Sequence, residues 1–341
     1  MIDIQSVNHI LISRTDNIGD VILTLPLAIQ FKQMYPNIKI TFLAQDYTRA
    51  LVEACPAIDE FLSWNVLSSM KQSEAIKTLQ DKKLDCIIHA FPNKEIARLA
   101  KKAKIPYRIG TRRRWYHFIY CNDRINFSRA KSELHEMQLN MKLLSAFHIR
   151  VQDEINDLSQ LNFLKIHTAL PERLKKFLSP DRFNLIIHPL SNGNSREWPI
   201  SNFIALIKKL PLNQFNILIT GSAKEKNLIE SRIKSQCPEI HDLSGQCDLA
   251  ELIQLIDSCD GLVANSTGPL HIAAALGIHA LGLYPATQGM NPKRWGPIGK
   301  KAEFLMADSK CGAPRCHAVG DCLCMESITI SAVNNAILKW L

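Results

Sequence analysis

The chain has 341 residues, of which 46% are apolar and 21% are charged, a composition typical of a globular protein with two domains. The net charge of +9 indicates an anionic partner, which can be nucleic acid, a phosphorylated small molecule or an acidic membrane surface. No charge-free stretch reaches membrane-spanning length, and the first residues lack the basic flank and apolar core of a signal peptide. We therefore expect a cytoplasmic protein whose ten cysteines are reduced.

Short apolar runs alternate with helical segments in the first half of the chain, which predicts a doubly wound parallel sheet. We expect strands at residues 9–14, 38–43 and 84–89, and a helix at residues 21–35 that is interrupted by Pro26. Neither a G-x-G-x-x-G nor a P-loop motif occurs. Asp20 falls where the first loop meets its helix, so it is either a helix-end charge or a base that faces a ligand.

A basic cluster follows at residues 101–114, interleaved with and followed by Tyr107, Trp115 and Tyr116. Such a run is either a solvated charged face or a surface that holds phosphates or acidic sugars. No zinc-finger, RNA-recognition or helix-turn-helix signature accompanies it. We therefore do not expect a nucleic-acid partner.

The apolar periodicity weakens between residues 153 and 180, where we place the connection between two domains. It restarts with a strand at residues 184–188, a polar loop at 189–199 and a second strand at 215–220 that ends in a turn at 221–225. This order predicts a second α/β unit of the same kind.

The stretch N-S-T-G-P-L-H-I-A-A-A-L-G at residues 265–277 follows an apolar run at 261–264. Pro269 suits the first turn of a helix and Gly277 suits the position after its end, so the limits of a short helix are predicted. A helix that starts at the carboxyl end of a parallel strand favours a phosphate, and a nucleotide diphosphate is our first candidate ligand. The alternative is a turn that is merely capped, as in any α/β protein.

Four separated motifs resemble those of glycosyltransferase family 9, the lipopolysaccharide heptosyltransferases. They are R-T-D-N-I-G-D at 14–20, H-P-L-S-N-G-N-S-R-E-W-P at 188–199, L-S-G-Q-C-D-L-A-E-L-I at 243–253 and N-S-T-G-P-L-H-I-A-A-A-L-G at 265–277. The resemblance implies a GT-B fold, with two facing Rossmann-like domains that have parallel sheets. Their limits would be residues 1–160 for the acceptor domain, 161–180 for the linker and 181–327 for the nucleotide-sugar domain. A helix at 328–341 would pack back on the N-terminal domain.

The resemblance also implies the reaction. A family member transfers heptose from ADP-heptose to a Kdo-lipid A or heptosyl-Kdo acceptor, with inversion and without a bound metal or cofactor. The absence of any D-x-D sequence agrees with this. The enzyme would act in a Gram-negative cell at the cytoplasmic face of the inner membrane, with peripheral membrane contact.

The matched positions assign roles by resemblance. Asp20 corresponds to the base that takes a proton from the acceptor hydroxyl. The donor and its diphosphate would be held by Ser191, Asn192, Arg196, Ser266, Thr267, Gly268 and His271, with Glu225 at the ribose or adenine. The acceptor would be held by Arg14, Arg112, Arg113 and Arg114.

One position departs from the family pattern, because Ser266 replaces the acidic residue that usually precedes [ST]-G. A family member with another nucleotide sugar is therefore an alternative, and a non-catalytic nucleotide-sugar-binding protein is a second. The tail, with Cys311, Cys316, Cys322 and Cys324, has enough thiols for a structural zinc site, although its spacing is looser than two C-x2-C knuckles. We expect reduced thiols there and no metal at the catalytic site.

Overall fold

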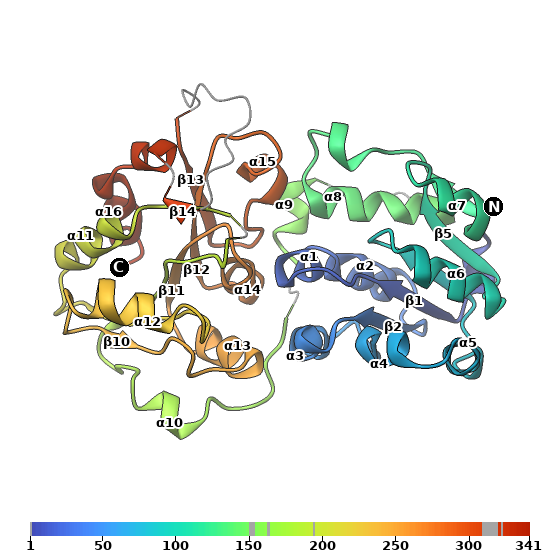
Figure 1. Cartoon of the computed structure of the whole chain (residues 1–341), viewed down its shortest axis with the longest axis horizontal. Coiled ribbons are helices and arrows are strands. Elements are labelled where there is room, and N and C mark those ends of the chain that lie inside the picture. Colours follow the sequence, from blue (N-terminus) through green and yellow to red (C-terminus); the bar gives the residue numbers. More distant parts are fainter. Residues whose placement is uncertain (1, 150–153, 162–163, 194, 309–319, 322) are drawn as a thin grey trace. The chain divides into compact units, whose positions relative to one another are not determined.

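The computed structural model describes residues 2–149, 154–161, 164–193, 195–308, 320–321 and 323–341. The chain divides into two compact units, Met1–Lys165 and Ile166–Leu341 (Figure 1). The division lies within the stretch 161–180 that the sequence predicts as a linker. In the described part of the chain, no helix is long and apolar enough to cross a membrane.

Unit 1 contains a six-stranded parallel sheet with the order β3-β2-β1-β4-β5-β6. Its strands are β1 (His9–Ser13), β2 (Lys39–Ala44), β3 (Glu60–Ser63), β4 (Cys86–His89), β5 (Tyr107–Thr111) and β6 (Asp123–Ile125). The strand order reverses between β1 and β4, which makes the carboxyl end of β1 a topological switch point. The predicted strands at 9–14, 38–43 and 84–89 are confirmed, and they are the three central strands β1, β2 and β4.

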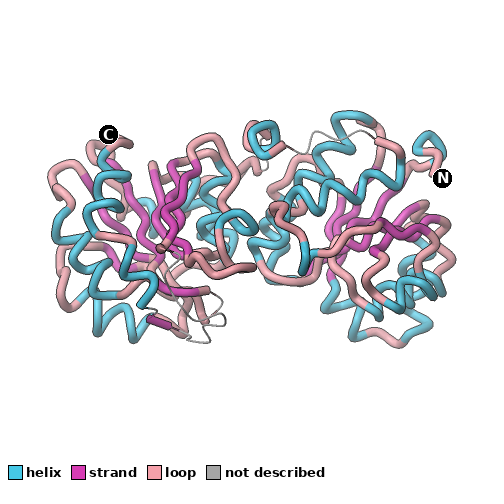
Figure 2. Tube along the Cα trace, turned by 90° about the horizontal axis from the view of Figure 1, so that it is seen from above, coloured by secondary structure: helices cyan, strands magenta, loops and turns pink. Residues whose placement is uncertain are grey.

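The helices of unit 1 lie on both faces of this sheet (Figures 1 and 2). They are α1 (Ile18–Ile22), α2 (Leu25–Met34), α3 (Arg49–Glu53), α4 (Trp64–Ser69), α5 (Gln72–Asp81), α6 (Lys94–Lys102), α7 (Trp115–Tyr120), α8 (Glu136–Met141) and α9 (Ile155–Leu158). The predicted interruption at Pro26 is confirmed, because α1 stops at Ile22 and α2 restarts with Pro26 in its first turn.

Unit 2 repeats this architecture with the sheet order β10-β9-β7-β11-β12-β13. The strands are β7 (Phe183–His188), β9 (Phe215–Ile219), β10 (His241–Asp242), β11 (Gly261–Asn265), β12 (His279–Tyr284) and β13 (Ala302–Met306), and a separate parallel pair joins β8 (Arg196–Glu197) to β14 (Gly320–Asp321). The switch point lies between β7 and β11. The loops that follow these two strands therefore emerge side by side, and they are the loops that carry the second and fourth motifs.

The helices of unit 2 are α10 (Glu172–Lys175), α11 (Ile200–Lys209), α12 (Lys226–Ile229), α13 (Leu249–Asp257), α14 (Gly268–Leu276), α15 (Pro292–Trp295) and α16 (Ile330–Leu338). Short 3-10 helices occur at Ile4–Ser6, Asp46–Thr48, Arg129–Lys131, Lys142–Phe147 and Leu323–Ser327, and a π-helical turn at Glu230–Lys234. The predicted limits of α14 are confirmed. Pro269 lies in its first turn, and Gly277 ends it with a φ of 80°, a left-handed conformation that favours glycine.

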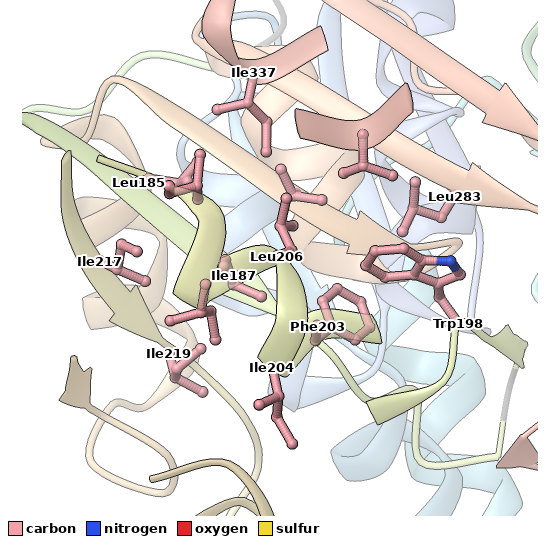
Figure 3. Close-up of a cluster of buried hydrophobic side chains, with 14 of the residues drawn as sticks. Leu185, Ile187, Trp198, Phe203, Ile204, Leu206, Ile217, Ile219, Leu283 and Ile337 are labelled. Carbon is pink, nitrogen blue, oxygen red and sulfur yellow. The ribbon is translucent and has the colours of Figure 1, made fainter. Parts of the chain in front are cut away.

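The core of unit 2 forms around a fully buried tryptophan, Trp198 (Figure 3). Its ring meets Phe203 of α11 edge to face, with centroids 4.8 Å apart. Its Nε1 donates to the carbonyl of Ile328 at 2.8 Å, just before α16. The indole therefore joins the loop after β7 to the start of the last helix.

The C-terminal helix differs in position from the prediction. We expected it on the N-terminal domain, but α16 belongs to unit 2, where Val333, Ala336 and Ile337 are buried in the same core as Trp198. Their spacing places them on one face of the helix, which packs beside α11. Burial of this apolar face within unit 2 accounts for the difference.

Candidate functional site

A buried arginine organises the carboxyl end of β1. Arg14 follows this strand directly and is only 2% exposed. Its guanidinium contacts three carboxylates: Asp16 at 2.7 Å, Glu136 at 2.9 Å and Asp20, all through ion-paired hydrogen bonds. Burial opposes the charge of Arg14, but the three carboxylates outweigh it and raise the pKa. Arg14 is therefore a permanent cation that orients Asp20 at the switch point.

A second arginine extends this network. Arg129 Nε donates to Glu136 at 2.9 Å, and its Nη2 donates to the carbonyl of Ala90 and to Asn140 Oδ1, both at 2.8 Å. Asn140 Nδ2 in turn donates to the carbonyl of Leu23 at 2.9 Å. Glu136 is fully buried between the two arginines. The network therefore links α8, the end of β4 and the segment between α1 and α2.

The sequence prediction missed Arg129, Glu136 and Asn140. They lie more than one hundred residues after Arg14 and belong to none of the quoted motifs. The side chain of His135 caps α8 in the structure, but histidine is not among the usual N-cap residues, so the sequence did not indicate this helix start. A helix cap indicates where a helix starts but says nothing about which distant charge it meets.

Asp16 lies in the same loop as Asp20 and shares the guanidinium of Arg14. Burial raises its pKa to about 6, a shift that Arg14 opposes and the charge of Asp20 reinforces. Tyr47 donates its hydroxyl to the backbone carbonyl of Asp16 at 2.9 Å, while its side chain remains 51% exposed. An exposed aromatic ring therefore stands beside the two aspartates.

The raised pKa of Asp16 predicts a pH dependence of stability. The folded chain binds this proton more tightly than the unfolded chain, whose carboxyl pKa is near 3.8. Protonated Asp16 therefore stabilises the fold below pH 3.8, and this stabilisation is lost as the pH rises through about 6. Asp16→Asn removes the titration, so the free energy of unfolding of wild type relative to this variant should fall between pH 4 and pH 7. Urea unfolding at both pH values measures this difference, and a constant or rising difference would contradict the assignment.

A cavity of about 260 Å³ lies beside this network in unit 1. Two predicted acceptor residues, Arg113 and Arg114, line it together with Arg129. The remaining lining residues are Pro92, Thr111, Phe127, Ser128 and Ala130. Arg112 is not among them, and its Nε donates to the carbonyl of Arg124 at 3.3 Å. With three cationic side chains, the cavity suits an anionic group.

In unit 2, the loop after β7 is folded around Glu197 and Glu225. Glu197 Oε1 accepts from the backbone N–H and the hydroxyl of Ser191, both at 2.7 Å. Glu225 Oε1 accepts from the backbone N–H of Asn192 at 3.0 Å, and its Oε2 accepts from the N–H and the hydroxyl of Ser222. Asn192 has a φ of 52°. Glu225 thus joins the loops after β7 and β9, a role that we did not predict.

The loop after β7 is also tied to the start of α14. Asn265, fully buried at the end of β11, accepts from the N–H of Trp198 at 2.8 Å and donates to the carbonyl of Pro189 at 2.7 Å. The second and fourth motifs are therefore joined by one side chain. The sequence predicts no role for Asn265 beyond its motif, because its bonds to both ends of the loop depend on the sheet order.

The first turn of α14 has the features of an anion site. Thr267 is the N-cap residue, its side chain makes no capping bond, and its buried Oγ1 has no hydrogen-bond partner among the described residues. His271 is 4% exposed in the same helix, and Arg196 on β8 is 6% exposed. The helix dipole and unpaired backbone N–H groups at such a start favour a phosphate.

Ser266 lies between Asn265 and Thr267 and interacts with a buried tyrosine. Tyr284, at the end of β12, donates its hydroxyl to the carbonyl of Trp295 at 2.6 Å. Burial raises the pKa of Tyr284, and a hydrogen bond with Ser266 lowers it in part. The tyrosine hydroxyl therefore interacts with both Trp295 and Ser266.

Three of the four tail cysteines, Cys311, Cys316 and Cys322, lie outside the described residues. Reduced thiols in the tail, rather than a zinc site, therefore stay a prediction. No three His, Cys, Asp or Glu side chains gather as a metal site within the described ranges. Elsewhere Cys55 and Cys86 are buried, and burial raises the pKa of the Cys55 thiol to about 12. Such thiols behave as small apolar side chains.

The fold and these two sites define a class of protein. Two Rossmann-like units in one chain, with a carboxylate at the switch point of one and a helix start suited to an anion at that of the other, have the architecture of GT-B glycosyltransferases. The family model for "Glycosyltransferase family 9 (heptosyltransferase)" matches residues 73–318. The chain belongs to glycosyltransferase family 9, as the motifs indicated.

Individual glycosyltransferase sequences are similar to this chain. A Haemophilus influenzae protein named "Putative glycosyltransferase" is 27% identical over 306 residues, which cover 85% of this chain and 86% of that one. Lipooligosaccharide heptosyltransferase 2 from the same organism is 27% identical over 319 residues, with coverages of 87% and 88%. Both similarities extend over most of each chain.

Solved structures share the fold. A family 9 glycosyltransferase from Veillonella parvula superimposes with a TM-score of 0.77 at 19% identity and covers 98% of this chain and 97% of its own. The Escherichia coli heptosyltransferase WaaC, solved with ADP, superimposes with a TM-score of 0.72 at 18% identity, with coverages of 98% and 100%. The predicted GT-B fold is therefore confirmed.

Proposed function

We propose that this glycosyltransferase moves a heptose from ADP-heptose to an inner-core lipopolysaccharide acceptor, with inversion at the anomeric carbon. The observation that carries the proposal is the placement of Asp20, which the guanidinium of Arg14 orients at the switch point of unit 1. The ADP bound to the Escherichia coli enzyme of the same fold supports the choice of nucleotide.

In this mechanism the carboxylate of Asp20 takes the proton from the acceptor hydroxyl. The hydroxyl oxygen attacks the anomeric carbon from the face opposite the diphosphate, and the bond between that carbon and the phosphate oxygen breaks. ADP leaves with the electron pair. One new C–O bond replaces another, and the configuration at the anomeric carbon inverts.

The leaving ADP carries the developing charge, and unit 2 supplies groups to stabilise it. Backbone N–H groups at the start of α14, the hydroxyl of Thr267 and the cation of Arg196 are proposed to contact the diphosphate, with Ser191 and Asn192 from the loop after β7. His271 is proposed to reach the same anion. These contacts would stabilise the negative charge that a metal ion stabilises in other transferases. We therefore propose that the reaction needs no metal ion.

The acceptor is proposed to bind unit 1. The cavity lined by Arg113, Arg114 and Arg129 suits a carboxylate or phosphate of a Kdo-bearing lipid A. Arg129 also contacts Glu136, which contacts Arg14. An anion in the cavity would thus lie against Arg129, a member of the network that orients Asp20. Because such an acceptor is lipid-linked, we propose that the enzyme works at the cytoplasmic face of the inner membrane.

A second donor remains a candidate because of Ser266. A serine hydrogen-bonded to Tyr284 supplies no negative charge to the sugar hydroxyls, unlike the acid that is usual in the family. A transferase of the same mechanism with another nucleotide sugar fits this feature. Comparing ADP, UDP and GDP in one titration separates the two candidates.

Nucleotide binding provides the direct test of the donor site. ADP should bind more tightly than UDP, and Arg196→Ala should weaken ADP binding by about 10- to 100-fold, the value of a charge-assisted hydrogen bond. His271→Ala should weaken it in the same direction. Isothermal titration calorimetry measures these constants, and Arg232→Ala, an exposed arginine of unit 2, is the matched control. Tighter binding of UDP, or unchanged affinity in both variants, would refute this donor site.

A further inference from the structure

Helix α7 of unit 1 exposes its apolar side chains to solvent and buries a polar one. Trp115, Phe118 and Ile119 are 64%, 58% and 49% exposed. The side chain that the helix buries is a histidine, His117, whose Nδ1 accepts from the backbone N–H of Thr111 at 2.9 Å. Three large apolar side chains on six residues of helix thus face water, although each would be more stable away from it.

The reversed orientation is built into the packing of α7 on β5. A Cβ atom at Gly110 would lie 2.6 Å from Nδ1 of His117, so only glycine lets the imidazole reach the strand. With His117 anchored inward, the i+1 and i+2 neighbours Phe118 and Ile119 point outward. The exposure of the apolar side chains therefore follows from a specific inward contact.

The stretch of chain that contains α7 is rich in cationic residues. The chain has no Asp or Glu between Glu95 and Asp123, and this stretch contains eight cationic residues: Arg98, Lys101, Lys102, Lys104, Arg108, Arg112, Arg113 and Arg114. The net charge of the whole chain is +9, so the remaining residues are almost neutral together. The net positive charge of this protein is thus concentrated in the stretch of chain that contains this exposed apolar helix.

The cations lie directly beside the apolar side chains. Lys94 Nζ lies 4.9 Å from the ring centroid of Trp115, and the guanidinium carbon of Arg124 lies 4.8 Å from that of Phe118. Lys101 Nζ donates to the carbonyl of Ile119 at 2.9 Å. Each exposed apolar residue therefore has a cation next to it.

We propose that the α7 face, formed by Trp115, Phe118, Ile119 and the cations around them, docks on the surface of a membrane that contains anionic phospholipid. Tryptophan and phenylalanine insert between headgroups and acyl chains, while lysine and arginine attract the anionic headgroups at the same depth. A protein partner would also cover apolar side chains, but the excess of cationic residues, with no acid between Glu95 and Asp123, favours a uniformly negative surface. The inference deepens the proposed function, because it assigns a surface for reaching a lipid-linked acceptor.

Vesicle sedimentation tests the apolar part of the surface. The full chain is mixed with vesicles of phosphatidylcholine alone or with added phosphatidylglycerol. Wild type should bind the anionic vesicles at least about tenfold more tightly, and Trp115→Ser with Phe118→Ser should lose about tenfold of that affinity. Val66→Ser, which changes a side chain 50% exposed on α4 of the same unit, is the matched control and should bind like wild type.

A second pair of variants tests the charges. Lys101→Gln with Lys102→Gln should weaken binding to anionic vesicles, whereas Lys71→Gln with Lys77→Gln, on exposed positions before and within α5, should have a smaller effect. Raising the salt concentration should weaken the binding of wild type and reduce the difference between the two pairs, because salt screens exposed charges.

The outcomes separate this inference from the proposed function. Equal binding of wild type to both vesicle types, or an unchanged affinity of the Trp115/Phe118 variant, overturns the membrane surface but leaves ADP binding and transfer untouched. A variant that dissociates a dimer, as seen by sedimentation velocity, also overturns it and assigns the surface to a second copy of the chain. If the surface is correct, the variant transfers to a soluble, delipidated acceptor at the wild-type rate and loses activity only on acceptor in vesicles.

Discussion

Replacing Asp20 by asparagine should lower the turnover number for sugar transfer by about 10²- to 10⁴-fold, the usual contribution of a general base. The amide has nearly the shape of the carboxylate and still accepts a hydrogen bond from Arg14, but it does not take up a proton at neutral pH. ADP affinity should stay at the wild-type value, because the proposed nucleotide contacts lie in unit 2. Initial rates with saturating ADP-heptose and a Kdo-bearing acceptor measure the effect.

Asp16→Asn is the matched control, since Asp16 lies in the same loop and contacts the same guanidinium. It should retain most of the activity. A loss in Asp16→Asn together with a normal rate in Asp20→Asn would move the base to Asp16. Absence of transfer by wild type that still binds ADP would favour the non-catalytic binding protein.

Replacing Glu136 by alanine should destabilise unit 1 by about 3–5 kcal/mol, the effect of removing one partner from a buried ion pair. Glu136 is fully buried and contacts both Arg14 and Arg129 at 2.9 Å. Without it, two largely buried guanidinium groups lose their common counter-ion. Urea unfolding followed by hydrogen exchange of β1 and β4 peptides measures the free energy of unfolding of unit 1 separately from that of unit 2.

Two further variants make this result specific. Glu136→Gln keeps the shape and one acceptor oxygen, so its loss should be smaller than that of alanine. Glu133→Ala, at an exposed position three residues earlier, should change the stability of unit 1 by less than about 0.5 kcal/mol. If Glu136→Ala is as stable as Glu133→Ala, the two arginines are neutralised by other groups and the network has been misassigned.

The network and the cavity together give unit 1 a continuous series of contacts from the cavity to Asp20. Arg129 lines the cavity and contacts Glu136, while Glu136 contacts Arg14, which orients Asp20. Asn140 fixes the segment after α1 through the carbonyl of Leu23. A change in the cavity is therefore expected to affect the turnover number as well as acceptor affinity.

Side chains of unit 2 that hold the loop after β7 differ from those proposed to contact the ligand. Asn265 and Glu225 hold the loop after β7 by bonds to the backbone N–H groups of Trp198 and Asn192. Thr267 and Arg196 remain the proposed contacts of the diphosphate. Glu225, which we predicted at the ribose or adenine, already accepts three hydrogen bonds from the protein. Its ligand role stays a prediction, whereas its role in the loop is visible.

The sequence alone was sufficient for features that depend on a few neighbouring residues. The periodicity of apolar residues identified the central strands β1, β2 and β4, and Pro269 and Gly277 marked the limits of α14. Motif order identified the family and the GT-B fold. These features were predictable because strand burial, helix capping and left-handed turns are determined by local stereochemistry.

Only the tertiary structure decided which distant groups meet. The contacts of Glu136 and Arg129 with Arg14 and its surroundings, the bonds of Asn265 to the loop after β7, and the packing of α16 on unit 2 each join segments far apart in the chain. Such contacts are selected by the burial of charge and apolar surface once the strand order is established. A sequence pattern records which residues need a partner, whereas the fold determines which partner each of them has.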